Sequence, residues 1–140
     1  MRLLVITDEP GNTGFIKDGL EKASFAVDIA CGGRCGLALA LTNDYALIIL
    51  DRMIPVISAV EFCRQMHQTG SAVPILFLAP GNTPEDDGFD LKDGASDYIT
   101  KPFAFAELLA RIRVLLRHKT RNDDKNKYRW QRLALHRAEQ

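Results

Sequence analysis

Residues 46–51 have the sequence Ala-Leu-Ile-Ile-Leu-Asp, in which five consecutive apolar residues are followed by a carboxylate. An apolar run without polar alternation is typical of a strand covered on both faces, as in a parallel sheet. We interpret residues 46–50 as such a strand, with Asp51 at its end. Similar strand-like runs occupy residues 3–6, 25–29, 73–78 and 98–99.

Between these runs, apolar residues recur with the spacing of amphipathic helices. In residues 14–23 the predicted apolar stripe consists of Phe15, Ile16, Gly19, Leu20 and Ala23. Comparable segments cover residues 36–41, 59–67 and 107–116, and a weaker, more polar one covers residues 85–92. The alternation predicts an α/β fold of (βα)5 order, which right-handed crossovers would close into a five-stranded, doubly wound parallel sheet.

The composition is that of a small globular domain. The 140 residues are 46% hydrophobic, and 18 basic residues balance 18 acidic ones, so no global charge attracts nucleic acid or an anionic membrane. The apolar runs are far shorter than the ~20 residues of a membrane helix, and we expect no membrane association. Three cysteines without a CxxC pair fit a reducing compartment, so the expected localisation is cytoplasmic.

The character of the sequence changes near residue 119. Residues 119–127 contain no apolar side chain and are typical of a solvated linker. Residues 128–140 return to a strand-like pattern, with too little chain for a second core. We therefore expect one domain over residues 1–118, followed by a linker and then by either the start of another domain or a disordered tail.

Chemically active residues stand where the predicted strands end. Asp8 follows the first strand, Asp51 the third, and Lys101-Pro102 the fifth. In doubly wound sheets, ligands bind at the carboxyl ends of the strands. Two carboxylates and a lysine there suit a magnesium-dependent phosphoryl acceptor, because carboxylates hold the cation, one of them is the nucleophile, and the ammonium offsets phosphoryl charge. Either acid alone would mean little, since turns are often acidic.

Three stretches make the sequence resemble the receiver domains of two-component response regulators over residues 1–118. They are residues 1–9 (MRLLVITDE), 44–51 (DYALIILD) and 94–111 (GASDYITKPFAFAELLAR). The likeness is to the OmpR/PhoB subfamily, and within it to the copper- and silver-responsive branch. Residues 128–137 resemble the first strand of that subfamily's winged-helix DNA-binding domain, the rest of which lies outside this chain.

The resemblance implies a phosphoryl acceptor, Asp51, served by a sensor histidine kinase. It implies a Mg²⁺ ion held by Asp8, Asp51 and the backbone carbonyl of Met53, and it implies that Lys101 pairs with the phosphoryl oxygens. Such a domain regulates transcription through its DNA-binding domain. It is not an ordinary enzyme, although it assists its own phosphorylation and dephosphorylation.

The resemblance also implies a switch and a homodimer. The Lys101–Pro102 peptide would be cis, and Tyr98 would be the aromatic side chain that changes orientation on activation. The dimer would form through the face made by residues 85–92, 98–99 and 107–116, where the charged residues matching the subfamily's ion pairs are Asp97, Glu107 and Arg111. Other expected partners are absent, so we expect a weakened dimer; the plainer interpretation is a solvated charged face.

The sequence departs from the family pattern at the switching positions. Thr7 stands where an acid is usual, so one carboxylate near the metal is missing. Ala79 replaces a Ser or Thr whose hydroxyl bonds the phosphoryl group, and Pro80 has no backbone N–H to donate. Each lost donor forfeits roughly 1.5–3 kcal/mol with a charged partner. We therefore expect slow phosphorylation with a weak conformational response.

Two other functions stay open at the level of sequence. A pseudo-receiver would keep the fold as a phosphorylation-independent dimerisation or protein-binding module. Residues 8–14 (DEPGNTG) faintly resemble the phosphate loop of FMN-binding flavodoxins, but the two acids there would repel a phosphate. Cys31 and Cys35 invite a metal-site interpretation, but they lack nearby histidines and we expect ordinary thiols.

Overall fold

The strands and helices alternate along the chain. The computed structural model describes residues 1–7, 10–51, 58–79 and 96–117, with the backbone alone for residues 10–12. Its elements are β1 (Arg2–Ile6), α1 (Pro10–Lys22), β2 (Ala26–Ala30), α2 (Gly33–Thr42), β3 (Leu47–Asp51), α3 (Ala59–Gln68), β4 (Ile75–Ala79) and β5 (Asp97–Thr100). A further helix covers residues 105–117. The helix expected at residues 85–92 lies outside the described residues.

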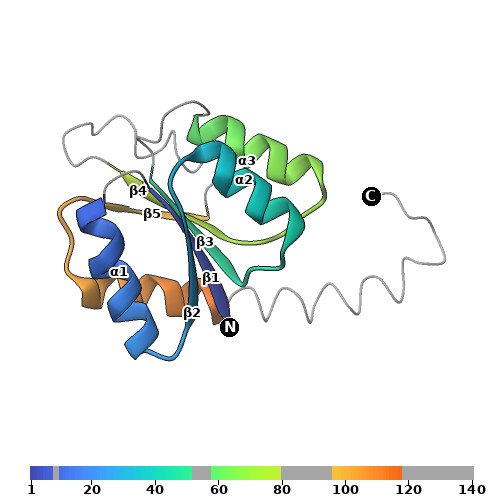
Figure 1. Cartoon of the computed structure of the whole chain (residues 1–140). Helices are drawn as coiled ribbons and strands as arrows, with labels where there is room; N and C mark the ends of the chain where they lie inside the picture. The colour runs from blue at the N-terminus through green and yellow to red at the C-terminus, as the bar shows by residue number, and fades with distance from the viewer. Residues whose placement is uncertain (8–9, 52–57, 80–95, 118–140) are drawn as a thin grey trace.

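The five strands form one parallel sheet in the order β2-β1-β3-β4-β5 (Figure 1). This order confirms the predicted five-stranded, doubly wound fold of the α/β class. Every residue of β3 and β4 is buried, which explains why their sequences show no polar alternation. The edge strand β2 is only partly covered, with a single fully buried residue, Ala30.

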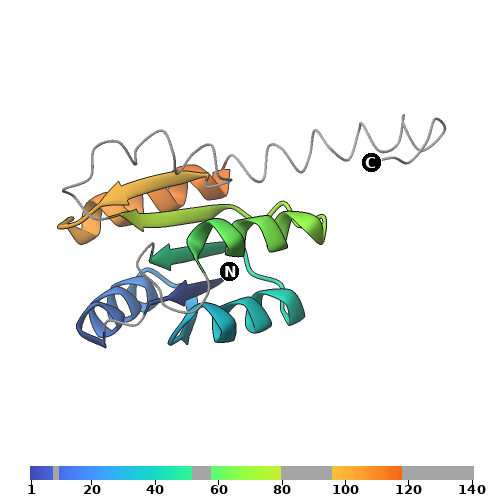
Figure 2. The ribbon, with the colours of Figure 1, turned by 90° about the horizontal axis from the view of Figure 1, so that it is seen from above.

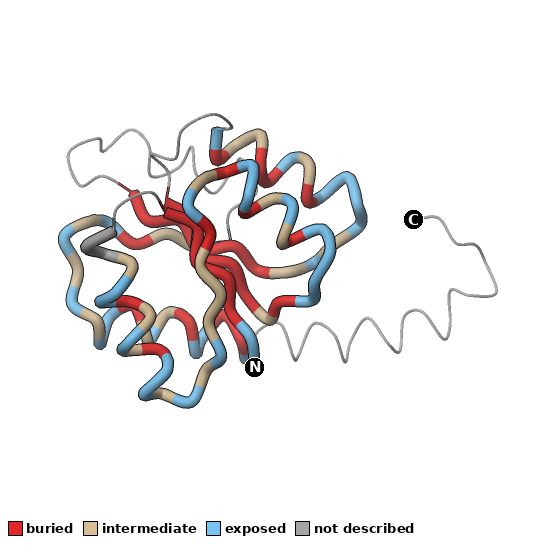
Figure 3. The backbone as a smooth tube through the Cα atoms, viewed as in Figure 1, coloured by how far each residue is buried: buried red, intermediate tan, exposed pale blue. Residues whose placement is uncertain are grey.

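Helices cover both faces of the sheet, as Figure 2 shows from above. On one face, Leu4 and Ile6 of β1 pack in a cluster with residues of α2 and α3. On the other, Leu3 and Val5 pack with α1 and the helix of residues 105–117. The buried residues therefore follow the sheet through the centre of the molecule (Figure 3). No helix in the described part of the chain is long and apolar enough to cross a membrane.

One residue of the predicted apolar stripe in α1 is not buried. Ile16 and Leu20 are fully buried, whereas Phe15 is 51% exposed. The Phe15 ring instead packs edge-on against Phe105, with ring centroids 5.9 Å apart. Phe105 also lies over Gly19, where an added Cβ would be 2.5 Å from its ring. Phe105 therefore covers this part of α1, and Phe15 packs against it at the surface.

The boundaries of several elements also differ from those expected. α1 begins at Pro10 rather than at residue 14, since proline is tolerated in the first turn, where backbone N–H groups have no helical partner. β4 begins at Ile75 because the preceding Val73 N–H is donated to the Ser71 hydroxyl, at 3.2 Å, rather than to a neighbouring strand. Asp51 is the last residue of β3, not the first after it.

Candidate functional site

Asp51 ends the central strand of the sheet with a fully buried side chain. β3 lies between β1 and β4, so its carboxyl end is flanked by the ends of both neighbours. Burying a carboxylate is costly unless cations or hydrogen-bond donors surround it. The structure must therefore supply partners to Asp51.

Two side chains donate to the same oxygen of this carboxylate. The Lys101 ammonium nitrogen Nζ lies 2.8 Å from Asp51 Oδ2. The Thr7 hydroxyl donates to the same Oδ2 at 3.2 Å. Thr7 is 1% exposed, whereas the Lys101 side chain is 21% exposed. The buried acid is thus paired with an ammonium that still contacts solvent.

Strand order explains how these residues meet. Thr7 follows β1, the direct neighbour of β3, whereas Lys101 follows β5, which is two strands away. Lys101 must therefore reach across the end of β4, where the buried Ala79 presents only a methyl group. The Lys101 N–H is donated to the Ala79 carbonyl at 2.9 Å, which fixes the backbone of Lys101 beside β4. The Lys101–Pro102 peptide bond is cis, as the resemblance implied.

Part of the predicted site lies outside the described residues. Asp8, Met53 and Pro80 fall there, so the structure brings together Asp51, Lys101 and Ala79 from the expected set. Thr7 joins them as a hydrogen-bond donor. Within residues 1–7, 10–51, 58–79 and 96–117, no group of three or more His, Cys, Asp or Glu side chains is placed to hold a metal ion.

The direct bond from Thr7 to Asp51 was not predicted from the sequence, which suggested a lost acid and a hydroxyl able to bond a metal-bound water. A signal did exist, because Thr7 follows an apolar strand in the same way as Asp51 ends one. Residues at the ends of adjacent parallel strands lie about 4.8 Å apart, within reach of a hydroxyl. What the sequence did not give was the direction of that hydroxyl.

The residues proposed for switching and dimerisation lie around β5. Tyr98 is partly buried and packs against the apolar cluster of α2 and α3. Arg111 bonds Asp97 within the chain through two contacts of 3.0 and 3.1 Å, and its second nitrogen lies 3.7 Å from Glu107. These charges therefore form an ion-pair group on one surface of the chain.

The three cysteines are free thiols. Cys31 and Cys35 are exposed, and Cys63 is buried in the core cluster of α3. The core position of Cys63 agrees with its place on the apolar stripe of its helix.

The fold and the site together define a class of protein: a doubly wound α/β domain with a buried, lysine-paired carboxylate at the carboxyl edge of its sheet. Residues 3–113 match the family described as the response regulator receiver domain. This match covers most of the chain, and the chain belongs to that family.

Individual relatives agree with this assignment. The chain is 45% identical over 117 residues to the transcriptional regulatory protein CusR of Escherichia coli K12, covering 84% of this chain and 52% of CusR. It thus spans about half the length of the curated relatives it matches.

Solved receiver domains share the fold. The Francisella response regulator 1452 receiver domain superposes with a TM-score of 0.79 at 29% identity, covering 84% of this chain and 98% of that one. The receiver domain of sensor histidine kinase PA1611 from Pseudomonas aeruginosa, solved with magnesium coordinated in its active site cleft, gives 0.75 at 26% identity, covering 82% and 96%.

Proposed function

We propose that Asp51 accepts a phosphoryl group from a sensor histidine kinase. The observation that carries the proposal is the fully buried Asp51 carboxylate with the Lys101 ammonium 2.8 Å from its Oδ2. A carboxylate can attack a phosphoryl group to form an acyl phosphate, and a neighbouring ammonium offsets the charge on the transferred oxygens. Membership in the receiver family supports the same role.

The donor set fits Mg²⁺. Magnesium prefers oxygen ligands and is held by one or two carboxylates together with water and phosphate oxygens. Asp51 provides one carboxylate, and Asp8 and the Met53 carbonyl are proposed as the further protein ligands, because they follow the adjacent ends of β1 and β3. When bound, the ion would neutralise charge on the phosphoryl group. Thr7 adds a hydroxyl but no charge, so magnesium affinity is expected to be low.

The response to phosphorylation is proposed to be weak. Ala79 is buried beside Lys101, and its methyl group cannot donate a hydrogen bond to a phosphoryl oxygen. Without this hydrogen bond, phosphorylation would do little to favour the reoriented state of Tyr98, the proposed aromatic switch. The same observation favours the second candidate function, a pseudo-receiver that binds proteins or dimerises without a phosphate signal.

In the longer protein, the output is proposed to be transcription. The curated relatives are named transcriptional regulatory proteins. We place this chain in the OmpR/PhoB subfamily and its copper- and silver-responsive branch, with residues 119–127 as a linker and residues 128–140 as the start of a winged-helix DNA-binding domain. The protein would act in the cytoplasm as a signalling protein whose catalysis is limited to its own aspartyl phosphate.

A homodimer is proposed through the surface that includes β5 and the helix of residues 105–117. Asp97, Glu107 and Arg111 have partly exposed side chains, so they can exchange their contacts within the chain for contacts with a second copy. Exposed ion pairs contribute at most about 1 kcal/mol each, and the dimer is therefore expected to be weak.

Intact-mass spectrometry tests phosphoryl acceptance. The chain is incubated with acetyl phosphate, with and without Mg²⁺, beside an Asp51→Asn variant. We expect a slow gain of one phosphoryl group that needs both magnesium and Asp51. An adduct that persists in Asp51→Asn would place the acceptor elsewhere, and no adduct in the native chain would leave the pseudo-receiver as the function.

A further inference from the structure

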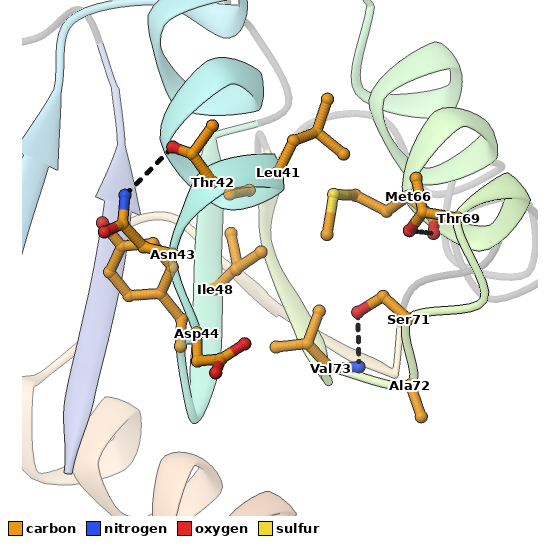
Figure 4. A pocket seen from close by; sticks show the side chains of 12 residues that line it. Leu41, Thr42, Asn43, Asp44, Ile48, Met66, Thr69, Ser71, Ala72 and Val73 are labelled. Atoms are coloured by element: carbon orange, nitrogen blue, oxygen red, sulfur yellow. Dashed lines mark hydrogen bonds between the residues drawn. The ribbon is translucent and has the colours of Figure 1, made fainter.

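A cavity of about 530 Å³ opens at the amino ends of β3 and β4, at the opposite edge of the sheet from Asp51 (Figure 4). Its walls come from the end of α2, the end of α3 and the connections that lead from these helices to the next strands. The lining residues are Ala40, Leu41, Thr42, Asn43, Asp44, Tyr45, Ile48, Met66, Thr69, Ser71, Ala72 and Val73. None of them belongs to the site around Asp51.

The inner wall of the cavity is apolar. Ile48 and Met66 are buried at 0% and 2% exposure, and Val73 packs against the same core cluster. Leu41 is 47% exposed and lies with these three side chains around the gap in Figure 4. A ligand with a compact apolar body would remove this leucine and the partly exposed Val73 from water, which is favourable. The volume is within the range of small-molecule sites, roughly 300–1,000 Å³.

The charge of the lining is negative. Among the residues that the structure describes, Asp44 is the one charged residue of the lining, and in Figure 4 its carboxylate lies across the gap from Val73. Both α2 and α3 end at this cavity, and the carboxyl end of a helix carries a partial negative charge. The part of the lining that the structure describes contains no Lys, Arg or His to balance them. The cavity therefore favours a cation.

Hydrogen bonding points to a ligand that donates. The Thr42 hydroxyl gives its proton to the Ala38 carbonyl at 2.8 Å, and the Thr69 hydroxyl gives its proton to the Met66 carbonyl at 2.6 Å. A hydroxyl has one proton, so both groups can only accept further bonds, and the Thr42 oxygen already accepts one from the Asn43 side-chain amide at 3.2 Å. The Asp44 carboxylate also accepts. Amidinium and guanidinium groups match such a lining, because they are planar cations that carry several donors and no acceptor.

We propose that this cavity binds a small organic cation, an amidinium or guanidinium on a compact apolar body. The cation lies beside Asp44, and the apolar body covers Leu41 and Val73. The site is independent of phosphoryl acceptance, since it lies at the other edge of the sheet.

The test uses three probes of similar shape and different charge: benzamidine as the cation, benzamide as the neutral form and benzoate as the anion. Each is titrated into the ¹⁵N-labelled chain while amide chemical shifts are followed. We expect saturable shifts in residues 40–45 and 69–73 with benzamidine. Affinity for benzamide should be roughly fivefold lower, the ratio given by one exposed charge pair, and benzoate should bind more weakly still.

Exposed residues supply the variants, so folding is preserved. Asp44→Asn should lower the benzamidine affinity to that of benzamide, whereas Asp18→Asn, which removes an exposed acid from α1 on the other face, should leave it unchanged. Leu41→Ser should lower the affinity for benzamidine and the affinity for benzamide by the same factor. The proposal is overturned if these amides show no saturable shift, if the three probes bind equally, or if Asp44→Asn has no effect.

Discussion

Thr7 decides the balance of charge at the site. Its hydroxyl donates to a buried carboxylate that is also paired with Lys101, so within the described residues an acid, an ammonium and a neutral donor are in contact. An acid at the same position would put two carboxylates side by side, which is unfavourable unless a cation lies between them. On the proposed function, Thr7 would therefore stabilise the metal-free domain and lower its affinity for magnesium.

Replacing Thr7 with an acid should reverse this balance. In Thr7→Asp, the free energy of unfolding in EDTA should fall by at least about 1 kcal/mol, because a hydroxyl donor is lost and a like charge is added. The increase in the free energy of unfolding on adding Mg²⁺ should grow by about 1.4 kcal/mol for each tenfold rise in magnesium affinity. Urea unfolding with EDTA and with Mg²⁺ measures both quantities. Thr7→Asn is the uncharged control, and an equal magnesium gain in the two variants would contradict the argument.

At the scale of elements, the edge strand β2 pairs with β1 and is also joined to the α2–β3 connection by a side-chain hydrogen bond. The Tyr45 hydroxyl donates to Asp28 Oδ2 at 2.7 Å, and Arg2 lies 3.7 Å from the same carboxylate oxygen. Burial of the Tyr45 ring, together with the hydrogen bond to Asp28, raises the pKa of Tyr45 to about 12. The contact therefore depends on a protonated phenol.

The alkaline stability of the domain should show this contact. The pKa of an unfolded tyrosine is about 10, so the folded state holds the phenolic proton more tightly. The stabilisation is fully present below pH 10 and is lost as the pH rises toward 12. Urea unfolding across this range should show a smaller loss of stability in Tyr45→Phe than in the native chain. Identical slopes in the two proteins would mean that the contact does not form in solution.

How far the sequence predicted the elements depended on burial. β3 and β4 were evident because strands covered on both faces leave uninterrupted apolar runs. The position of Phe15 was not, because periodicity gives the side of a helix but not which of two rings, Phe15 or Phe105, occupies the space beside Gly19. The pairing of Lys101 with Asp51 needed the strand order, since these residues come from strands separated by β4. Thr7 was located but its hydrogen bond was not foreseen.

At the scale of the whole molecule, the proposed signal must pass from Asp51 across β4 to the surface formed by β5 and the helix of residues 105–117. Ala79 lies on this route, between the acceptor and Lys101's strand. A side chain there that can bond the phosphoryl group would connect the two ends of the route.

Restoring the lost donors should therefore strengthen phosphate-driven association. The double variant Ala79→Thr with Pro80→Ala regains a hydroxyl and a backbone N–H, which at roughly 1.5–3 kcal/mol each would enlarge the phosphate-driven shift in population by about a hundredfold or more. With beryllofluoride and Mg²⁺, sedimentation should show more dimer for this variant than for the native chain. Adding Asp51→Asn should abolish the response, and adding Arg111→Ala should weaken it. An unchanged dimer fraction in the double variant would reject the role given to Ala79.

The close fit of Phe105 over Gly19 has a consequence for how the domain can move. The space between Gly19 of α1 and the Phe105 ring has no room for even a methyl group, so α1 packs closely against the last described helix. A rearrangement that slid one past the other would have to break the Phe15–Phe105 ring contact as well. In the proposed switch, a movement of the helix of residues 105–117 should therefore carry α1 with it rather than slide past it.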